Sequence, residues 1–207
     1  MAAPGRSTLR DLFDESPTPH IAHPPQTHQR QFYVATDGSY RPDGGGLGAV
    51  IETADGERVA RVSLPDTPPD NNVAEYRALH LGLDVLAARA PDDSRVGVLI
   101  DHDELAGNVN RTVLSQSDPE WVAELRVPSG SENHWRGIRA RIAGFEELRA
   151  ARIDGRHNPA HPLANEPASF AHVNRQPQRC VLPEPPSTDP SDRQIPPPSR
   201  AERRAGD

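Results

Sequence analysis

Three carboxylates stand where they could act together on a metal ion. Asp37 ends an apolar run at 32–37, Asp101 ends another at 95–101, and Glu75 falls early in a helical pattern between them. Carboxylates that converge repel one another unless they are protonated or bound to a cation. Their hard oxygens suit Mg²⁺ or Mn²⁺, and two such ions can activate water and stabilise the leaving oxygen of a phosphodiester. The trio therefore predicts a divalent-metal site.

Each carboxylate alone has an ordinary structural explanation. An Asp at a strand end is usually a turn or cap residue, and a single helical Glu usually faces solvent. Their joint placement is what favours chemistry, because parallel neighbouring strands end at the same edge of a sheet. Asp37 and Asp101 should then lie close together, and a helix packed across that edge could bring Glu75 to both.

The hydrophobic pattern predicts an α/β fold with a mixed five-stranded sheet. Strands are expected at 32–37, 47–52, 58–62, 95–101 and 149–154. Helices are expected over 73–86, with Asp70 or Asn71 as N-cap, and at 103–110, 118–126, 135–148 and 159–170. This order predicts three antiparallel strands followed by two parallel ones, with helices on both faces.

Composition divides the chain into three parts. We expect a flexible N-terminal segment at 1–30, a folded domain at 31–173 and a disordered Pro-rich tail at 174–207. Within the first segment, Leu9, Leu12 and Phe13 share one side of a short amphipathic turn and resemble the plug by which replication enzymes bind a sliding clamp. The clamp is therefore one candidate partner.

Charge and cysteine content restrict the partners and the compartment. The net charge is −7, and all 23 basic Lys and Arg residues are Arg. An acidic protein does not attract a phosphate backbone by its overall field, so local Arg residues or metal ions must do so. The single cysteine, the lack of an apolar run that could span a membrane and the lack of a signal peptide predict a soluble, cytoplasmic protein without membrane contact.

Four segments occur in an order that resembles the type 1 ribonuclease H family. They are Val-Ala-Thr-Asp-Gly-Ser at 34–39, Asp-Asn-Asn-Val-Ala-Glu-Tyr-Arg-Ala-Leu at 70–79, Val-Leu-Ile-Asp at 98–101 and Arg-His-Asn-Pro-Ala-His-Pro-Leu-Ala-Asn at 156–165. The resemblance covers 32–170 and is nearest to the short archaeal and bacterial members without a basic protrusion. It implies a ribonuclease-H-like fold.

The resemblance also implies an activity. Asp37 would bridge two Mg²⁺ ions, and Glu75 and Asp101 would complete the coordination of one of them. The reaction would be hydrolysis of the RNA strand of an RNA–DNA hybrid, leaving 3′-hydroxyl and 5′-phosphate ends. The substrate-binding residues would be Gly38, Ser39, Asn71, Asn72, Arg156 and Asn158, of which the first four would read the minor groove and the 2′-hydroxyls.

Two positions depart from the family pattern. His161 stands where the family has a fourth metal-binding Asp. An imidazole can ligate metal or accept a proton, but it adds no negative charge and suits Mg²⁺ poorly, so we expect His161 to join the catalytic and metal-binding set with Mn²⁺ possible or preferred. Asp70 replaces a Thr that touches a DNA phosphate, and it would repel phosphate unless it turns away as a helix cap.

Two alternative functions follow from these residues. One is a catalytically weak module of the same fold that binds hybrids or double-stranded RNA, because His161 leaves the fourth position ambiguous. The other is a 3′–5′ exonuclease of the same superfold, which needs Asp-x-Glu on the first strand. The segment Asp37-Gly38-Ser39 argues against the exonuclease.

Overall fold

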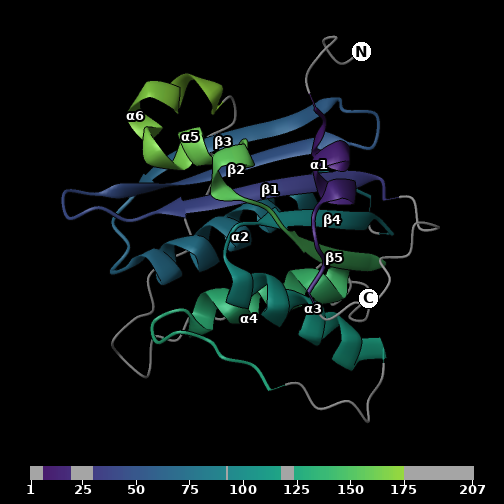
Figure 1. Cartoon of the computed structure of the whole chain (residues 1–207). Coiled ribbons are helices and arrows are strands. Elements are labelled where there is room, and N and C mark those ends of the chain that lie inside the picture. Colours follow the sequence, from purple (N-terminus) through teal and green to yellow (C-terminus); the bar gives the residue numbers. More distant parts are fainter. Residues whose placement is uncertain (1–6, 20–29, 92, 118–123, 175–207) are drawn as a thin grey trace, which may run out of the picture.

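A mixed five-stranded sheet forms the centre of the structure (Figure 1). The strands are β1 (Phe32–Ser39), β2 (Gly45–Thr53), β3 (Arg58–Asp66), β4 (Arg95–Ile100) and β5 (Glu147–Arg152). Their order is β3-β2-β1-β4-β5; β1, β2 and β3 pair antiparallel, and β4 pairs parallel with both β1 and β5. The predicted sheet, with three antiparallel strands followed by two parallel ones, is confirmed.

The computed structural model describes residues 7–19, 30–91, 93–117 and 124–174. The predicted Pro-rich tail from 175 onward and residues 118–123 of the predicted helix at 118–126 lie outside this range. Residues 124–126 form no helix. None of the described helices is long and apolar enough to cross a membrane.

The central strands are buried on both faces because their side chains alternate between two cores. On β1, Val34 belongs to the core cluster beneath the long helices, whereas Tyr33 and Ala35 belong to the cluster on the opposite face. The same alternation places Val98 and Leu99 of β4 in different clusters. Burial on both faces explains why these strands are continuous apolar runs in the sequence.

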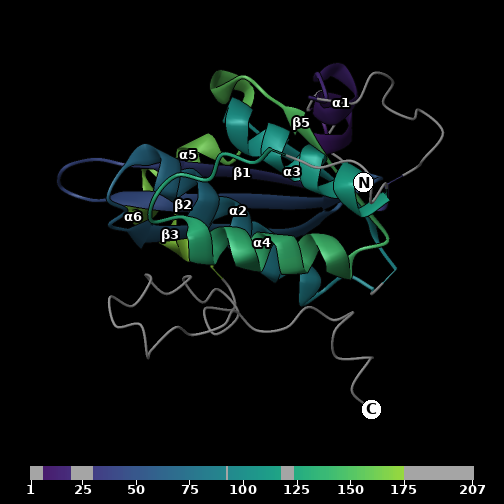
Figure 2. The same ribbon diagram turned by 90° about the horizontal axis from the view of Figure 1, so that it is seen from below.

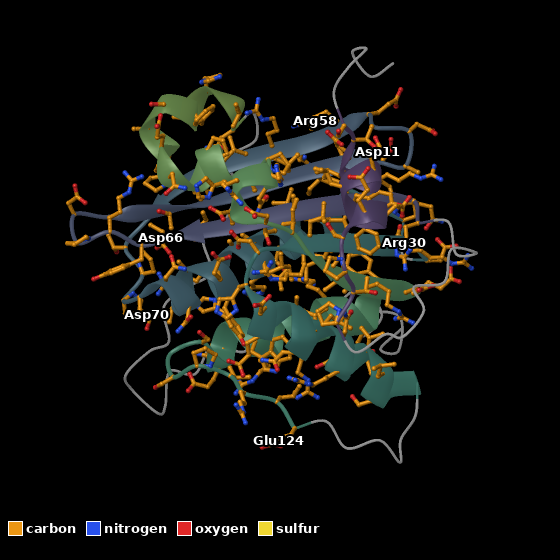
Figure 3. All side chains as sticks on the ribbon, viewed as in Figure 1. Asp11, Arg30, Arg58, Asp66, Asp70 and Glu124 are labelled. Carbon is orange, nitrogen blue, oxygen red and sulfur yellow. The ribbon has the colours of Figure 1, made fainter. Side chains whose placement is uncertain are left out.

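Three long helices cover one face of the sheet, and α2 and α4 lie side by side there (Figure 2). They are α2 (Asn71–Ala87), α3 (Asp103–Ser117) and α4 (Glu132–Gly144). The carboxylate of Asp70 accepts a hydrogen bond from the backbone N–H of Val73 at 2.9 Å and so caps α2. Figure 3 shows Asp70 at the beginning of this helix. Asp70 therefore serves as the helix cap that the sequence allowed.

Short helices cover the other face. They are α1 (Leu9–Glu15), α5 (His161–Asn165) and α6 (Pro167–Phe170), with 3₁₀ turns η1 (Gly155–His157) and η2 (Ala171–Val173) nearby. The predicted helix at 159–170 is interrupted because Glu166 has φ −130° and ψ 56° and Pro167 follows it. A residue before proline is disfavoured in the helical region, so α5 ends and α6 begins at this point.

The predicted helix at 135–148 ends earlier than expected. Helix α4 stops at Gly144, and Leu148 lies in β5, where it pairs with Val96 of β4 and enters the core from the sheet. An apolar residue at helical spacing can equally well be the inward residue of a following strand, so periodicity alone could not place the boundary.

Helix α1 packs on the sheet, within the segment expected to be flexible. Leu9 and Phe13 are 1% and 2% exposed, and the ring of Phe13 contacts Tyr33 edge-to-face with Arg30 stacked over it at 4.8 Å. Figure 3 shows Arg30 beside this helix. Two of the three residues expected to plug into a sliding clamp are therefore core residues, and they are inaccessible to a clamp while α1 is docked.

Candidate active site

Four functional side chains meet at one edge of the sheet. Asp37 lies near the end of β1, Asp101 directly follows β4, and the parallel pairing of these strands brings the two carboxylates together. His161 begins α5, and one ligand atom each from Asp37, Asp101 and His161 lie within 4.8 Å of one another. The predicted meeting of Asp37 and Asp101, and the predicted position of His161 beside them, are found in the structure.

Close backbone contacts bring α2 and α5 to this edge. A β-carbon on Gly38 would lie 2.2 Å from the carbonyl carbon of Ala74, so only glycine lets β1 approach the helix turn that carries Glu75. A β-carbon on Gly48, which pairs with Asp37, would lie 2.4 Å from the carbonyl oxygen of Ala160. Glycine there admits α5, which places His161 over Asp37.

Glu75 is buried at the site, as Asp37 is. Its side chain is 3% exposed, and its carboxylate accepts a hydrogen bond from the backbone of Gly38. The second oxygen, Oε2, is buried and has no hydrogen-bond partner among the described residues. A buried carboxylate oxygen without a donor is costly, and a cation is one partner that would satisfy it.

Burial and mutual repulsion favour the protonated carboxyl groups in the metal-free site. Burial, followed by the charge of Asp101 and a hydrogen bond with it, raises the pKa of Asp37 to about 8. Burial and the charges of Asp101 and Asp37 raise the pKa of Glu75 well above its usual value. A divalent cation would reverse this preference, since it stabilises the ionised forms. The donor set, three carboxylates with one oxygen unsatisfied, fits such an ion.

The proton position on His161 follows from Asn165, one helical turn away. Asn165 Oδ1 accepts hydrogen bonds from Ser39 Oγ at 2.9 Å and from the Arg41 guanidinium at 3.3 Å. Because guanidinium can only donate, the Asn165 amide nitrogen faces His161 Nε2, at 3.0 Å. Nε2 then accepts, and the Nδ1–H of the neutral ring points at Asp37 Oδ2, at 3.3 Å. Nδ1 could hold a cation only after this proton moved to Nε2 and Asn165 turned.

The expected substrate-binding residues fall into two groups. Asn71, Asn72 and Arg156 are exposed, and Arg156 is paired with Asp154 at 3.0 Å. Gly38 and Ser39 are buried at the site, where the backbone of Gly38 donates to Glu75 and the Ser39 hydroxyl donates to Asn165.

Asn158 does not have the role that was expected. It is 3% exposed, its amide donates to the carbonyl of Thr36 at 2.8 Å, and its oxygen accepts from the N–H of Ala160 at 3.0 Å. Both ends are occupied inside the protein, so Asn158 cannot contact substrate. It ties the loop before α5 to β1 and thereby positions His161.

Two residues that touch the site were not singled out from the sequence. Asn165 could have been found, because it lies four residues after His161 and therefore on the same face of a helix. Arg41 lies in the β1–β2 hairpin, and its bond to Asn165 joins positions 124 residues apart. Local spacing gives no signal for such a contact.

Comparison with known proteins identifies the fold. No protein-family profile and no sequence of a curated protein matches the chain. Among solved structures, ribonuclease H1 from the halophilic archaeon Halobacterium salinarum NRC-1 is 22% identical, with a TM-score of 0.53, and the match covers 67% of this chain and 98% of that one.

A ribonuclease H1 named LC11 is similar to the same extent. Its complex with an RNA/DNA hybrid is 24% identical to this chain with a TM-score of 0.53, and the match covers 68% of this chain and 99% of that one. A second structure of the LC11 enzyme, isolated from compost, has a TM-score of 0.52. Each match spans almost the whole of the other chain. The chain therefore has the ribonuclease-H-like fold.

Proposed function

We propose that this protein is a metal-dependent endoribonuclease that hydrolyses the RNA strand of RNA–DNA hybrids. The observation that carries the proposal is the convergence of Asp37, Glu75 and Asp101 on one buried edge, with Glu75 Oε2 lacking a donor among the described residues. The fold supports it, since a structure of similar fold was solved with an RNA/DNA hybrid.

The carboxylates would hold two divalent ions. Bound there, the ions would activate water and stabilise the leaving 3′-oxygen of the cleaved phosphodiester. Asp37 contacts both Asp101 and His161, so it would be a ligand shared by the donor set. His161 would complete the set in place of a fourth carboxylate once its proton had moved from Nδ1 to Nε2 and Asn165 had turned, and its nitrogen donor would then favour Mn²⁺ over Mg²⁺.

The chain's own residues would bind and orient the substrate. Asn71 and Asn72 are the first two residues of α2, the helix that carries Glu75, and both are exposed. Their amides, with the backbone near Gly38 and Ser39, would contact the minor groove, where the RNA 2′-hydroxyls distinguish a hybrid from duplex DNA. The exposed guanidinium of Arg156 would contact phosphate.

The test is cleavage of an end-labelled RNA–DNA hybrid in Mg²⁺ or Mn²⁺, compared with Asp37→Asn. This variant keeps the size of the side chain and removes its charge. Internal RNA cuts that leave 5′-phosphates and are lost in Asp37→Asn are the expected result. Tight hybrid binding without cuts would instead favour the catalytically weak binding module, and equal cleavage of double-stranded RNA would extend the substrate class.

A further inference from the structure

The histidine that follows Asp101 links the beginnings of two helices at the site. His102 Nδ1 accepts a hydrogen bond from the backbone N–H of Leu105 at 3.1 Å, and its carbonyl accepts from the N–H of Ala106. His102 is therefore the N-cap of α3. Its other ring nitrogen, Nε2, lies 2.9 Å from Oδ1 of Asn72, in the first turn of α2.

These two contacts determine which groups donate. A nitrogen that accepts from a backbone N–H carries a lone pair, so in the neutral ring the proton is on Nε2. Nε2–H then donates to Asn72 Oδ1. The ring is held in this orientation by Tyr76, whose ring meets it edge-to-face at 6.5 Å and whose hydroxyl accepts a hydrogen bond from Asn108 at 2.9 Å.

The consequence for Asn72 is a fixed amide orientation. With Oδ1 occupied by His102, the NH₂ group is the end left available, and it has no hydrogen-bond partner among the described residues. Minor-groove edges present acceptors at every base pair, purine N3 and pyrimidine O2, and the 2′-hydroxyl can accept as well. A fixed donor suits all of them, whereas the flipped amide would place its oxygen against those acceptors.

We propose that His102 is a positioning residue that fixes Asn72 as a hydrogen-bond donor toward the minor groove of a hybrid, in a sequence-independent way. This inference rests on the proposed function, because it needs Asn72 to contact the nucleic acid. His102 contacts Asn72 and would act through it, which separates its effect from that of Asp101, its neighbour in the chain.

The test compares two substitutions of His102. Serine keeps a side-chain oxygen that can cap α3 but cannot reach Asn72, whereas alanine loses both functions. Binding of a short RNA–DNA hybrid of mixed sequence is measured by fluorescence anisotropy with Ca²⁺ in place of the catalytic ion, and kcat and KM are measured with Mn²⁺. Asn72→Ala and the double variant with His102→Ser complete a thermodynamic cycle.

The expected result is that His102→Ser weakens hybrid binding about fivefold, the effect of one hydrogen bond. It should raise KM with little change in kcat, and it should have no further effect on binding in the Asn72→Ala background. The alanine variant should lose the same affinity and also melt at a lower temperature, because its cap is gone.

Three outcomes would overturn the inference. Unchanged binding in His102→Ser would show that Asn72 needs no partner. A full additional loss in the Asn72→Ala background, or a loss confined to kcat, would show that His102 acts through α3 and Asp101. If the wild-type protein itself neither bound nor cut the hybrid, the proposed function would fail, and this inference with it.

Discussion

The hydrogen-bond chain from Arg41 through Asn165 to His161 determines how the fourth position of the site behaves. It directs an N–H at Asp37 instead of offering a lone pair to a cation. An N–H that faces a carboxylate favours its ionised form, so it opposes the burial and the Asp101 charge that keep Asp37 protonated up to about pH 8; an Asp at position 161 would add to them. The site therefore holds Asp37 and Asp101 close together with one negative charge fewer than a site that has a carboxylate at position 161.

A carboxylate at position 161 should increase cleavage with Mg²⁺, the harder of the two ions. His161→Asp adds a negative oxygen ligand, so Mg²⁺-supported cleavage should rise by about tenfold, within the range that changes around a metal site produce. The preference for Mn²⁺ over Mg²⁺ should shrink. Initial rates in each ion measure this, with His161→Asn as the control that removes the imidazole without adding charge. Equal Mg²⁺ rates in wild type and His161→Asp would refute the expectation.

The raised pKa of Asp37 makes metal-free stability depend on pH. The folded protein keeps a proton up to about pH 8, whereas the unfolded chain releases it near the ordinary value of 3.8. The stabilisation is complete below that lower pKa and is lost as the pH rises through about 8. Thermal unfolding in a chelator should show Tm falling over this range, by about 2–4 °C for each kcal/mol of repulsion that develops.

Two comparisons check the origin of this pH dependence. Asp37→Asn should flatten the dependence of Tm on pH, because it removes the titrating group. Mg²⁺ or Mn²⁺ should raise Tm more at pH 8 than at pH 6, because fewer protons compete with the ion. A wild-type Tm that rises between pH 6 and 8 in chelator would contradict the pKa assignment.

At the residue scale, the site residues that could be predicted from the sequence are those whose placement depends on local geometry. Asp37 and Asp101 could be predicted because the end of an apolar run in the sequence marks the end of a buried strand. The motif around Asn158 suggested substrate contact, but its partners, Thr36 and Ala160, are known only once β1 and the loop before α5 are placed together. Burial of a polar residue depends on such long-range packing.

Helices α2 and α4 meet through two histidines whose ring nitrogens have no hydrogen-bond partner within the described part of the chain. His80 and His134 are 5% and 1% exposed, their rings are 5.8 Å apart, and Gly137 leaves the space for His80. Burial lowers the pKa of both, to about 3 for His134. Asp84, 3.6 Å from His80, opposes the shift there, while its partner Arg141 adds to it.

This helix interface should be sensitive to acid. Below about pH 6.5 the unfolded chain is protonated at these histidines, whereas the buried rings of the folded protein stay neutral. The stability that is present above that pH is therefore lost as the pH falls toward 3. His134→Phe, which keeps a ring without a titrating group, should lose less stability than wild type between pH 7 and pH 5 in urea unfolding. An identical loss in both proteins would mean that other groups carry the acid sensitivity.

Helix α1 should contribute to stability through its buried side. Phe13→Ala should lower the free energy of unfolding by about 3 kcal/mol, since a buried aromatic ring is removed. Leu12→Ala is the matched control: Leu12 lies on the same helix but is only partly buried, so its loss should be much smaller. Denaturant unfolding measures both. Equal, small effects would mean that α1 is not docked in solution.

Element prediction succeeded where one pattern dominated. The strand at 95–101 and the helix beginning at Asn71 have long, unmixed periodicity and clear caps. The docking of α1 could not be predicted, because its seven residues are too few for a stable isolated helix and its order comes from the sheet beneath it. The interruption of the predicted last helix at Glu166 was not predicted either, because a single following proline was its signal in the sequence.

At the scale of the whole molecule, charge limits how a hybrid could be held. A net charge of −7 gives no general attraction for phosphates, so affinity must come from bound cations and a few arginines. The arrangement of strands, which the sequence predicted from the order of its elements, places the acidic site at the edge where β1 and β4 end.

The measurement that tests the central claim most directly is strand-resolved cleavage of three duplexes of one sequence. An RNA–DNA hybrid, duplex RNA and duplex DNA, each labelled on either strand, are incubated with Mn²⁺ and with chelator. Internal cuts in the RNA strand of the hybrid, absent in chelator and in Glu75→Gln, are the predicted result. An uncut hybrid, or duplex DNA cut as fast as the hybrid, would contradict a ribonuclease H activity at this site.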